Sequence, residues 1–456
     1  MTHLLPRSTP ERQSVRSAAI SRLIAALDGI SHIHTLTVVR HGHVVAEATW
    51  APYEREVPTA MYSVSKSFTS IAVGLAVADG LLTVDDRVVD LLPDMVPEQP
   101  SGHLAALRVR HLLTMTTGHV VEPPLEDADW ARAALDAELT REPGTHWMYN
   151  TPATHLLSQV LQRLTGQRLV DYLAPRLFEP LGFRRPEWRQ SPTGVDAGGF
   201  GLSIRPEELA VFGQLLLQRG RWEGRQLVPA AWIDAATSRQ VANDPGDGDW
   251  NQGYGYQFWR CRHDAYRGDG AFGQYVVVLP EFDAVVAITG GLPDMQEPLD
   301  AIWDALLPAF DTDAAPEDVV AATPIAAIDG GSRHAAVAHE YEGPLRAIRV
   351  EDGLLAIDGW ELPWVPGSWS IGAFPPDPTA DRLWYGDRVA VSGGWSGETF
   401  RADLRLLGDA TTFHLQLEAS GHLRITRDVG FDGTDVWEGE PRNQPAVVAH
   451  HIAVSP

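Results

Sequence analysis

Two residue types are almost missing from this chain of 456 residues, which has one cysteine and one lysine. The single cysteine, Cys261, excludes an internal disulfide and a metal site built from several thiolates. No apolar run is long enough to cross a bilayer, and residues 1–22 do not resemble a secretory signal. We therefore expect a cytoplasmic protein that needs neither a membrane nor a metal.

Positive charge is also scarce relative to negative charge. The chain has 60 Asp+Glu residues against 36 Lys+Arg, and its formal net charge is −24. Nucleic acids and anionic membranes repel such a chain, so we expect neither as a partner. The hydrophobic content of 44% and the length are typical of a globular protein with two or three domains. None of these numbers indicates an oligomeric state.

Lysine is so scarce that its one position is informative. Lys66 is the only lysine, and the residues counted with it are all arginine. Arginine keeps its charge at any working pH, whereas a buried lysine can lose its proton and act as a base. Ser63 precedes Lys66 by three residues, and positions i and i+3 share one face of a helix. The pair therefore predicts a serine nucleophile activated by lysine, although Ser63 could instead only cap the helix.

Two further segments carry groups that fit this chemistry. Tyr149 follows a Pro-Gly turn and could relay a proton if the charge of Lys66 lowered its pKa. The alternative is a packed aromatic ring with a satisfied hydroxyl. Residues 268–273 have the letters of a dinucleotide fingerprint, but the strand follows these glycines instead of preceding them. Such glycines let a substrate approach the backbone, where an unpaired N–H can stabilise an oxyanion.

Hydrophobic periodicity predicts helices and strands over residues 1–311, which we interpret as one domain. Ser63 opens a long segment in which residues 68–78 are apolar or small on nearly every face, which predicts a helix buried on all sides. The other predicted helices span 16–27, 155–164, 206–218 and 299–307, and the predicted strands span 36–39, 44–50, 274–279 and 284–289.

The composition changes near residue 311. Residues 311–324 are rich in alanine, aspartate, threonine and proline, and residues 312–330 are predicted to form a linker. Short alternating runs separated by Gly-containing turns then predict an antiparallel β domain over residues 331–456. That domain carries no catalytic constellation, so we expect it to have a structural or lid-like role. Its apolar runs span 345–350, 354–357, 401–407, 412–417 and 423–426.

These segments, in this order, resemble the serine β-lactamase and penicillin-binding-protein superfamily. The resemblance is strongest to its class C-like branch of esterases, D-aminopeptidases and nylon-oligomer amidases, and covers roughly residues 30 to 310. It implies an α+β fold in which an antiparallel sheet flanked by helices meets an all-helical subdomain, with the active site between them. Further landmarks of the family are matched by residues 110–118, 180–183, 198–202 and 212–215.

The resemblance also implies roles for individual residues. Ser63 matches the nucleophile, Lys66 its base partner and Tyr149 the tyrosine of the second motif. Residues 268–270 stand where many relatives have Lys-Thr-Gly, which places the N–H of Ala271 beside that of Ser63 as a second oxyanion donor. The residues implied in substrate binding are Asn150, Thr151, Gly268 and Gly270.

Two departures from the family pattern narrow the expected function. Thr151 stands where the β-lactamases of this branch have asparagine, and no second lysine exists to hold a substrate carboxylate. We therefore expect a hydrolase that cleaves an ester or amide bond of a small acyl substrate through a Ser63 acyl-enzyme, rather than a true β-lactamase. The alternatives are an acyltransferase with the same acyl-enzyme and a non-catalytic sensor resembling a penicillin receptor. No cofactor is implied.

Overall fold

A computed structural model describes most of the chain, which divides into two compact units. The first unit consists of Met1–Thr49 and Arg55–Ala322, and the second consists of Trp50–Glu54 and Thr323–Pro456. Residues 312–318 of the predicted linker lie outside the described part of the chain. The described residues are 3–30, 32–125, 128–310, 319–332, 336–342, 345–373, 386–430 and 435–442.

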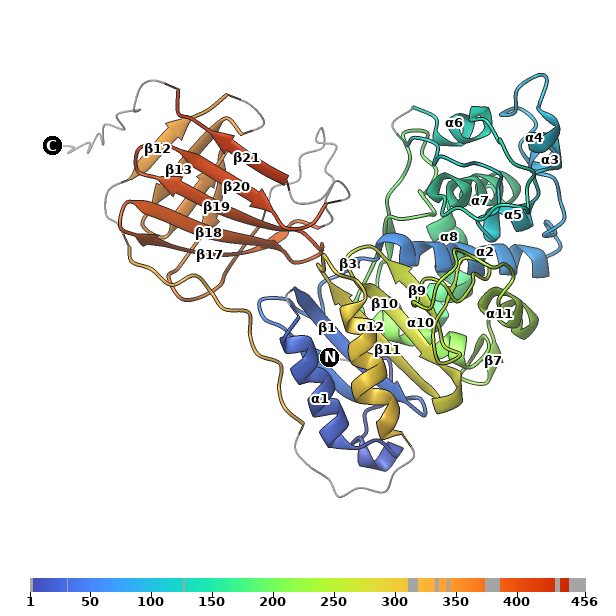
Figure 1. Ribbon diagram of the computed structural model, residues 1–456, viewed down its shortest axis with the longest axis horizontal. Helices are drawn as coiled ribbons and strands as arrows, with labels where there is room; N and C mark the ends of the chain where they lie inside the picture. Colours follow the sequence, from blue (N-terminus) through green and yellow to red (C-terminus); the bar gives the residue numbers. More distant parts are fainter. Residues whose placement is uncertain are drawn as a thin grey trace. The chain divides into compact units, whose positions relative to one another are not determined.

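The first unit is built on a six-stranded antiparallel sheet (Figure 1). Its strands, in their order across the sheet, are β2 His43–Thr49, β1 Ile33–Arg40, β11 Ala284–Gly290, β10 Gln274–Leu279, β9 Tyr266–Gly270 and β8 Trp259–Arg260. Strands β10 and β11 are buried at every position, because their uninterrupted apolar runs lie in the middle of the sheet. The strands predicted from the sequence in this region are confirmed.

Helices cover this sheet on both faces. On one face, α1 Ser17–Asp28 lies beside α12 Glu297–Ala301 (Figure 1). On the other face, α10 Pro206–Leu217 packs against β1, β10 and β11. Gly213 permits this close packing, because a Cβ there would lie 2.4 Å from a side-chain carbon of Val285. The sequence predicts all three helices, and the structure confirms them.

A helical subdomain lies beside the sheet (Figure 1). Its helices are α3 Val88–Leu91, α4 Gly102–Ala106, α5 Val109–Leu113, α6 Trp130–Asp136, α7 Thr151–Thr165 and α8 Leu169–Leu173. Helix α2, Ser65–Ala78, contacts α7 and α8 as well as β9, so it lies between the subdomain and the sheet. Its residues from Ser65 to Ala76 are all buried, as the sequence predicts. The start of α2 is therefore the place where the two parts of this unit meet.

The second unit contains two antiparallel sheets. One has the strands β12 Val337–Glu340, β13 Ala347–Glu351, β14 Leu354–Ile357 and β15 Trp360–Pro363. The other has β16 Ser370–Ala373, β17 Arg388–Ser396, β18 Thr399–Leu406, β19 Thr412–Glu418, β20 Leu423–Arg427 and β21 Asp435–Gly439. One core that includes Trp364 and Phe400 joins the two sheets. The predicted α+β fold class, with an antiparallel β region at the C-terminal end, is confirmed.

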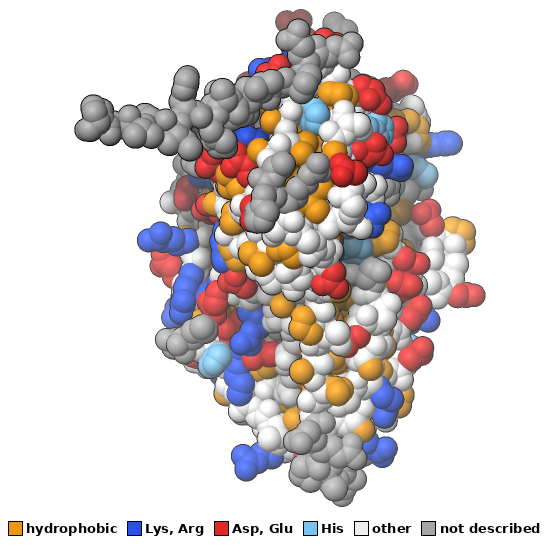
Figure 2. Space-filling view, turned by 90° about the vertical axis from the view of Figure 1, so that its left-hand side faces the viewer, with side chains coloured by type: hydrophobic (Ala, Val, Ile, Leu, Met, Phe, Trp, Pro, Cys, Tyr) orange, Lys and Arg blue, Asp and Glu red, His pale blue; other side chains and the backbone are white. Residues whose placement is uncertain are grey.

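The surface carries charges of both signs. On the face shown in Figure 2, acidic and basic side chains are interspersed, with scattered hydrophobic side chains between them. The negative net charge therefore does not make this face uniformly acidic. No helix in the described part of the chain combines the length and the hydropathy needed to cross a membrane.

Candidate active site

The predicted nucleophile lies in a strained turn just before α2. Ser63 is the middle residue of a 3-10 turn, Tyr62–Val64, that runs directly into the helix. Tyr62 has a φ of 45°, a left-handed conformation that is costly for an aromatic residue and is often found at functional turns. The N-cap of α2 is Val64 and no side chain caps this helix, so the interpretation of Ser63 as a helix cap is wrong.

Lys66 is 1% exposed, and three acceptor oxygens surround its side-chain nitrogen. Nζ lies 3.0 Å from Ser63 Oγ, 3.3 Å from Thr151 Oγ1 and 2.8 Å from the carbonyl oxygen of Gly199. Gly199 can approach so closely because it has no side chain, since a Cβ there would lie 2.7 Å from Thr151 Cγ2. The side chains of Ser63 and Lys66 thus meet, as their spacing of three residues predicts.

The environment of Lys66 favours its neutral form. Burial lowers the pKa of Lys66 to about 7, because the charged ammonium loses its hydration. The negative charges of Glu122 and Asp269 act in the opposite direction and raise this pKa. A substantial fraction of Lys66 is therefore neutral near pH 7, and a neutral amine can accept the proton of a neighbouring hydroxyl.

Tyr149 contacts both members of this pair. Its hydroxyl forms a hydrogen bond with Ser63, and Lys66 Nζ lies 4.7 Å from the centre of its ring. Burial raises the pKa of Tyr149, so the expectation that the charge of Lys66 lowers it is wrong. The phenol therefore stays protonated near neutral pH and can act as a hydrogen-bond donor. Its ring stacks on that of Trp259, with 5.5 Å between the ring centres, which fixes its orientation.

The end of β9 packs directly against the turn that carries the nucleophile. A Cβ at Gly270 would lie 2.4 Å from the carbonyl oxygen of Met61, so only glycine fits there. The ring of Phe272 contacts that of Tyr62 edge to face, with 5.2 Å between the ring centres. Ala271 lies between Gly270 and Phe272 in the chain, so its backbone is held alongside the same turn. The structure thus brings together the two backbone segments from which oxyanion donors are predicted.

The residues that alternate with these glycines along β9 form a buried ion pair. Arg267 is fully buried, and its Nε donates to Asp269 Oδ2 at 2.8 Å. The guanidinium group also lies 4.6 Å from the ring centre of Trp250. Gly268 stands between the two charged residues, and a Cβ there would lie 3.1 Å from Ser67 Oγ. Gly268, which the family resemblance places opposite a cationic lysine of many relatives, is therefore flanked by a neutralised pair.

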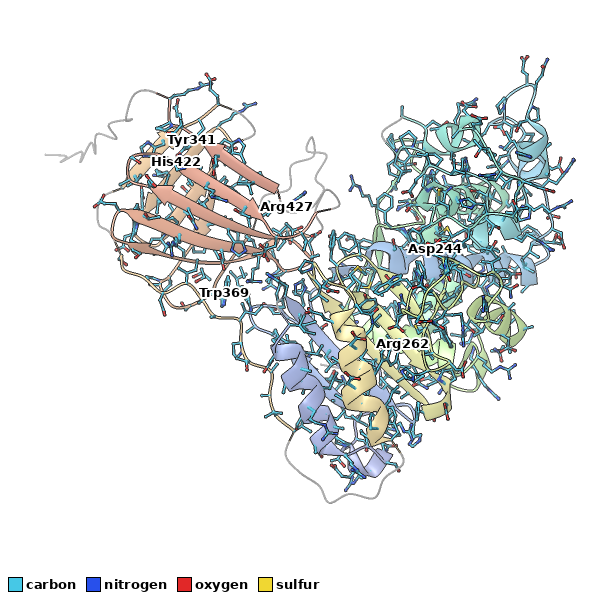
Figure 3. The ribbon with its side chains drawn as sticks, viewed as in Figure 1. Asp244, Arg262, Tyr341, Trp369, His422 and Arg427 are labelled. Atoms are coloured by element: carbon cyan, nitrogen blue, oxygen red, sulfur yellow. The ribbon has the colours of Figure 1, made fainter. Side chains whose placement is uncertain are left out.

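A buried carboxylate anchors the segment that holds Trp250. Asp249 is fully buried, and its side chain accepts hydrogen bonds from Arg262, Gln296 and Trp303. Figure 3 labels Arg262, which extends from the segment between β8 and β9. These donors come from separate parts of the chain, so the position of Trp250 against the buried guanidinium group depends on the folded first unit as a whole.

Asn150 and Thr151 have different roles at the start of α7. Asn150 is completely buried and is the N-cap of this helix, where its Oδ1 accepts a backbone hydrogen bond. Its Nδ2 donates to Thr117 Oγ1 at 3.3 Å, so its side chain is used within the fold. Thr151 instead turns its hydroxyl toward Lys66, and its N–H donates to Glu122 Oε1 at 2.5 Å. Of these two residues implied in substrate binding, only Thr151 lies against the reactive groups.

Three groups near the site are not found by reasoning from the sequence. The carbonyl of Gly199 belongs to a family landmark, and its pair of adjacent glycines is a signal for close backbone approach. Glu122 lies in a segment without periodicity, and Arg267 is one of many arginines. Neither has a local signal, because each acts through residues that are distant along the chain.

The assembled groups can perform covalent chemistry at a serine hydroxyl. Ser63 supplies the nucleophile, Lys66 the base and Tyr149 a phenol, all within contact of one another. This arrangement joins the start of α2, the segment before α7 and the end of β9. In the described part of the chain, no group of three His, Cys, Asp or Glu side chains could hold a metal ion.

Comparison with known proteins gives the family. Residues 20–307 match the model of the Beta-lactamase family, and the chain belongs to this family. The 6-aminohexanoate-dimer hydrolase of Paenarthrobacter ureafaciens is 26% identical over 290 residues, which cover 56% of this chain and 72% of that protein. Esterase EstB of Burkholderia gladioli is 29% identical over 175 residues, which cover 32% of this chain and 44% of that protein.

A solved structure also resembles this one. The octameric penicillin-binding protein homologue from Pyrococcus abyssi has a TM-score of 0.51 and 15% identity, with 91% of this chain and 97% of that chain covered. At this identity the likeness concerns the fold alone. The two curated relatives are matched over 72% and 44% of their own lengths, so their activities do not transfer directly to this chain.

Proposed function

We propose that this protein is a serine hydrolase that cleaves an ester or amide bond of a small acyl substrate through an acyl-enzyme on Ser63. The observation that carries the proposal is the distance of 3.0 Å between Lys66 Nζ and Ser63 Oγ, at a lysine whose pKa is lowered to about 7 by burial. The names of the two relatives, a dimer hydrolase and an esterase, support the same class of reaction.

The acylation step uses the neutral form of Lys66. Its amine accepts the proton of Ser63 while Ser63 Oγ forms a bond to the carbonyl carbon of the substrate. The N–H groups of Ser63 and Ala271 donate to the resulting oxyanion, and each well-placed donor contributes about 3–4 kcal/mol. The bond to the leaving group then breaks, and the proton passes from Lys66, directly or through the Tyr149 hydroxyl, to the departing alcohol or amine.

The deacylation step reverses these roles with water. A water molecule attacks the acyl carbon, and its proton passes through the Tyr149 hydroxyl to Lys66. The ester bond to Ser63 breaks, Ser63 Oγ takes the proton back, and the carboxylic acid leaves. Because the raised pKa of Tyr149 disfavours a free phenolate, its oxygen takes a proton in the same step in which its hydroxyl gives one to Lys66.

Time-resolved intact-mass spectrometry with an activated short-chain ester tests this function, with Ser63→Ala as the control. We expect an acyl adduct on Ser63 that forms and then decays, and no adduct in the variant. An adduct that persists in water but disappears when an alcohol or amine is added would indicate an acyltransferase. An adduct that persists under both conditions would indicate a sensor. If neither esters nor amides acylate Ser63, the proposed function is wrong.

A further inference from the structure

Strand β9 offers no free lysine or arginine side chain to a substrate bound at the reactive groups. Arg267 is fully buried, and Asp269 holds its Nε at 2.8 Å. The position between them is Gly268, where even a Cβ would lie 3.0 Å from Val276 Cγ1. A longer side chain there would have to displace its neighbours, and with glycine at this position β9 presents no lysine or arginine to a substrate. A substrate carboxylate therefore finds no fixed positive partner on this strand.

The carboxylate of Glu122 lies near Lys66, at the start of α7. Glu122 Oε1 accepts the N–H of Thr151 at 2.5 Å, and the hydroxyl of the same threonine lies 3.3 Å from Lys66 Nζ. The negative charge of Glu122 acts on both Lys66 and Tyr149. Glu122 is exposed, and within the described ranges no arginine or histidine side chain forms an ion pair with it. Its charge is therefore available to a ligand.

Exposed apolar side chains directly precede this carboxylate. Val120 is 44% exposed and Val121 is 76% exposed, so both apolar side chains can contact a ligand. The segment is anchored at Gly118, where a Cβ would lie 2.2 Å from the carbonyl oxygen of Arg141. Two exposed apolar side chains and a carboxylate thus follow one another in the chain, and the carboxylate contacts Thr151, whose hydroxyl reaches Lys66.

We propose that Glu122 gives the Ser63 site a preference for substrates that carry a positive charge near the scissile bond, with Val120 and Val121 contacting their alkyl part. The substrates are then esters or amides that bear an ammonium group, and carboxylate-bearing substrates are disfavoured. This inference rests on the proposed function, because it assigns the substrate class of the same site.

A matched series of three activated esters tests this preference. Nitrophenyl butanoate is the neutral member, and analogues with a terminal trimethylammonium or carboxylate group at similar length are the charged members. We expect kcat/KM to fall from the cationic to the neutral to the anionic ester, by about fivefold at each step, as one exposed ion pair allows. High salt is expected to reduce these ratios, because it screens exposed charges.

Two substitutions at Glu122 separate its charge from its other contacts. Glu122→Gln is expected to bring the cationic-to-neutral ratio close to one, and Glu122→Arg is expected to favour the anionic ester. The ratio is the readout, because Glu122 also raises the pKa of Lys66 and so affects the rate with every ester. Glu281→Gln is the matched control, since Glu281 follows β10 at the end opposite to Gln274 and is expected to keep the wild-type ratio.

The outcomes distinguish this inference from the proposed function. If the three esters react at equal rates in a Ser63-dependent manner, or if the anionic ester reacts fastest, the charge preference is wrong and the hydrolase function stands. If Glu122→Gln keeps the wild-type ratio, Glu122 is not the recognising group and the inference is wrong. If none of the three esters reacts at Ser63, the proposed function and this inference both fail.

Discussion

Two basic side chains, the buried Lys66 in the first unit and the partly exposed His414 in the second, have opposite pKa shifts. In the first unit, burial lowers the pKa of Lys66 to about 7, and the oxygens within reach of its Nζ belong to hydroxyl and carbonyl groups. In the second unit, His414 Nδ1 lies 2.5 Å from Asp403 and Nε2 lies 2.7 Å from Asp428. Hydrogen bonds to these two carboxylates raise the pKa of His414 to about 9.

The comparison shows that the balance between loss of water and direct contact with carboxylates decides what a basic side chain can do. Carboxylates in direct contact stabilise the charged form and turn His414 into a structural cation. Glu122 and Asp269 influence Lys66 only through their charges, with no hydrogen bond to Nζ among the contacts of the described residues. Lys66 therefore keeps a pKa at which it can exchange protons, which a catalytic base requires.

Replacement of the base gives the largest expected effect. Lys66→Arg keeps a positive charge but removes the neutral form, because arginine does not lose its proton at working pH. We expect kcat/KM with an activated ester to fall by about 10³–10⁴-fold, as for removal of a general base. Steady-state kinetics measure this loss, and circular dichroism checks that the variant is folded. Near-normal turnover by the folded variant would show that Lys66 is not the base.

The pH dependence of hydrolysis reports the same pKa. Because Lys66 must be neutral to act, we expect kcat/KM of the wild type to fall about tenfold per pH unit well below pH 7, with an apparent pKa near 7. Glu122→Gln removes a charge that raises this pKa, so the acidic limb should move to lower pH. Rates measured with a neutral ester from pH 5 to 9 test both statements. An acidic limb that does not move in the variant would contradict the assigned electrostatic effect.

The buried base also costs stability, and Lys66→Met should recover part of it. The folded-state pKa of about 7 lies below the usual 10.5, so the unfolded chain binds more protons between these values. The cost is therefore full below pH 7 and disappears as the pH rises to 10.5. We expect the inactive Lys66→Met variant to be about 2 kcal/mol more stable than wild type at pH 6, with a smaller difference at pH 10. Urea unfolding at both pH values measures this, and a gain that does not change with pH would indicate a packing effect instead.

The sequence predicts some of the contacts made by Lys66 and His414 but not others. Ser63 and Lys66 are close in the chain and share one helical face, so their contact follows from local spacing. Gly199 is 133 positions from Lys66, and its carbonyl contact depends on how a distant loop packs against α2. His414 gives no signal either, because its two carboxylates reach it only when β18 and β19 pair and β20 ends beside them. The hydrophobic periodicity of the sequence predicts neither of these long-range contacts.

The smallest expected effect on stability comes from removing the charge of His414. His414→Gln removes a charge whose folded-state pKa, about 9, lies above the usual 6.5. The stabilisation is therefore complete below pH 6.5 and is lost as the pH rises through 9. A third of the side chain remains exposed, which weakens the effect, so we expect the variant to be about 1 kcal/mol less stable at pH 6 and nearly equal to wild type at pH 10. Asp403→Asn should produce a similar pH dependence, because it removes one of the two partners. Urea unfolding of both variants tests this: a deficit that persists unchanged at pH 10 would mean that His414 stabilises the second unit by packing, and that its charge is not what distinguishes it from Lys66.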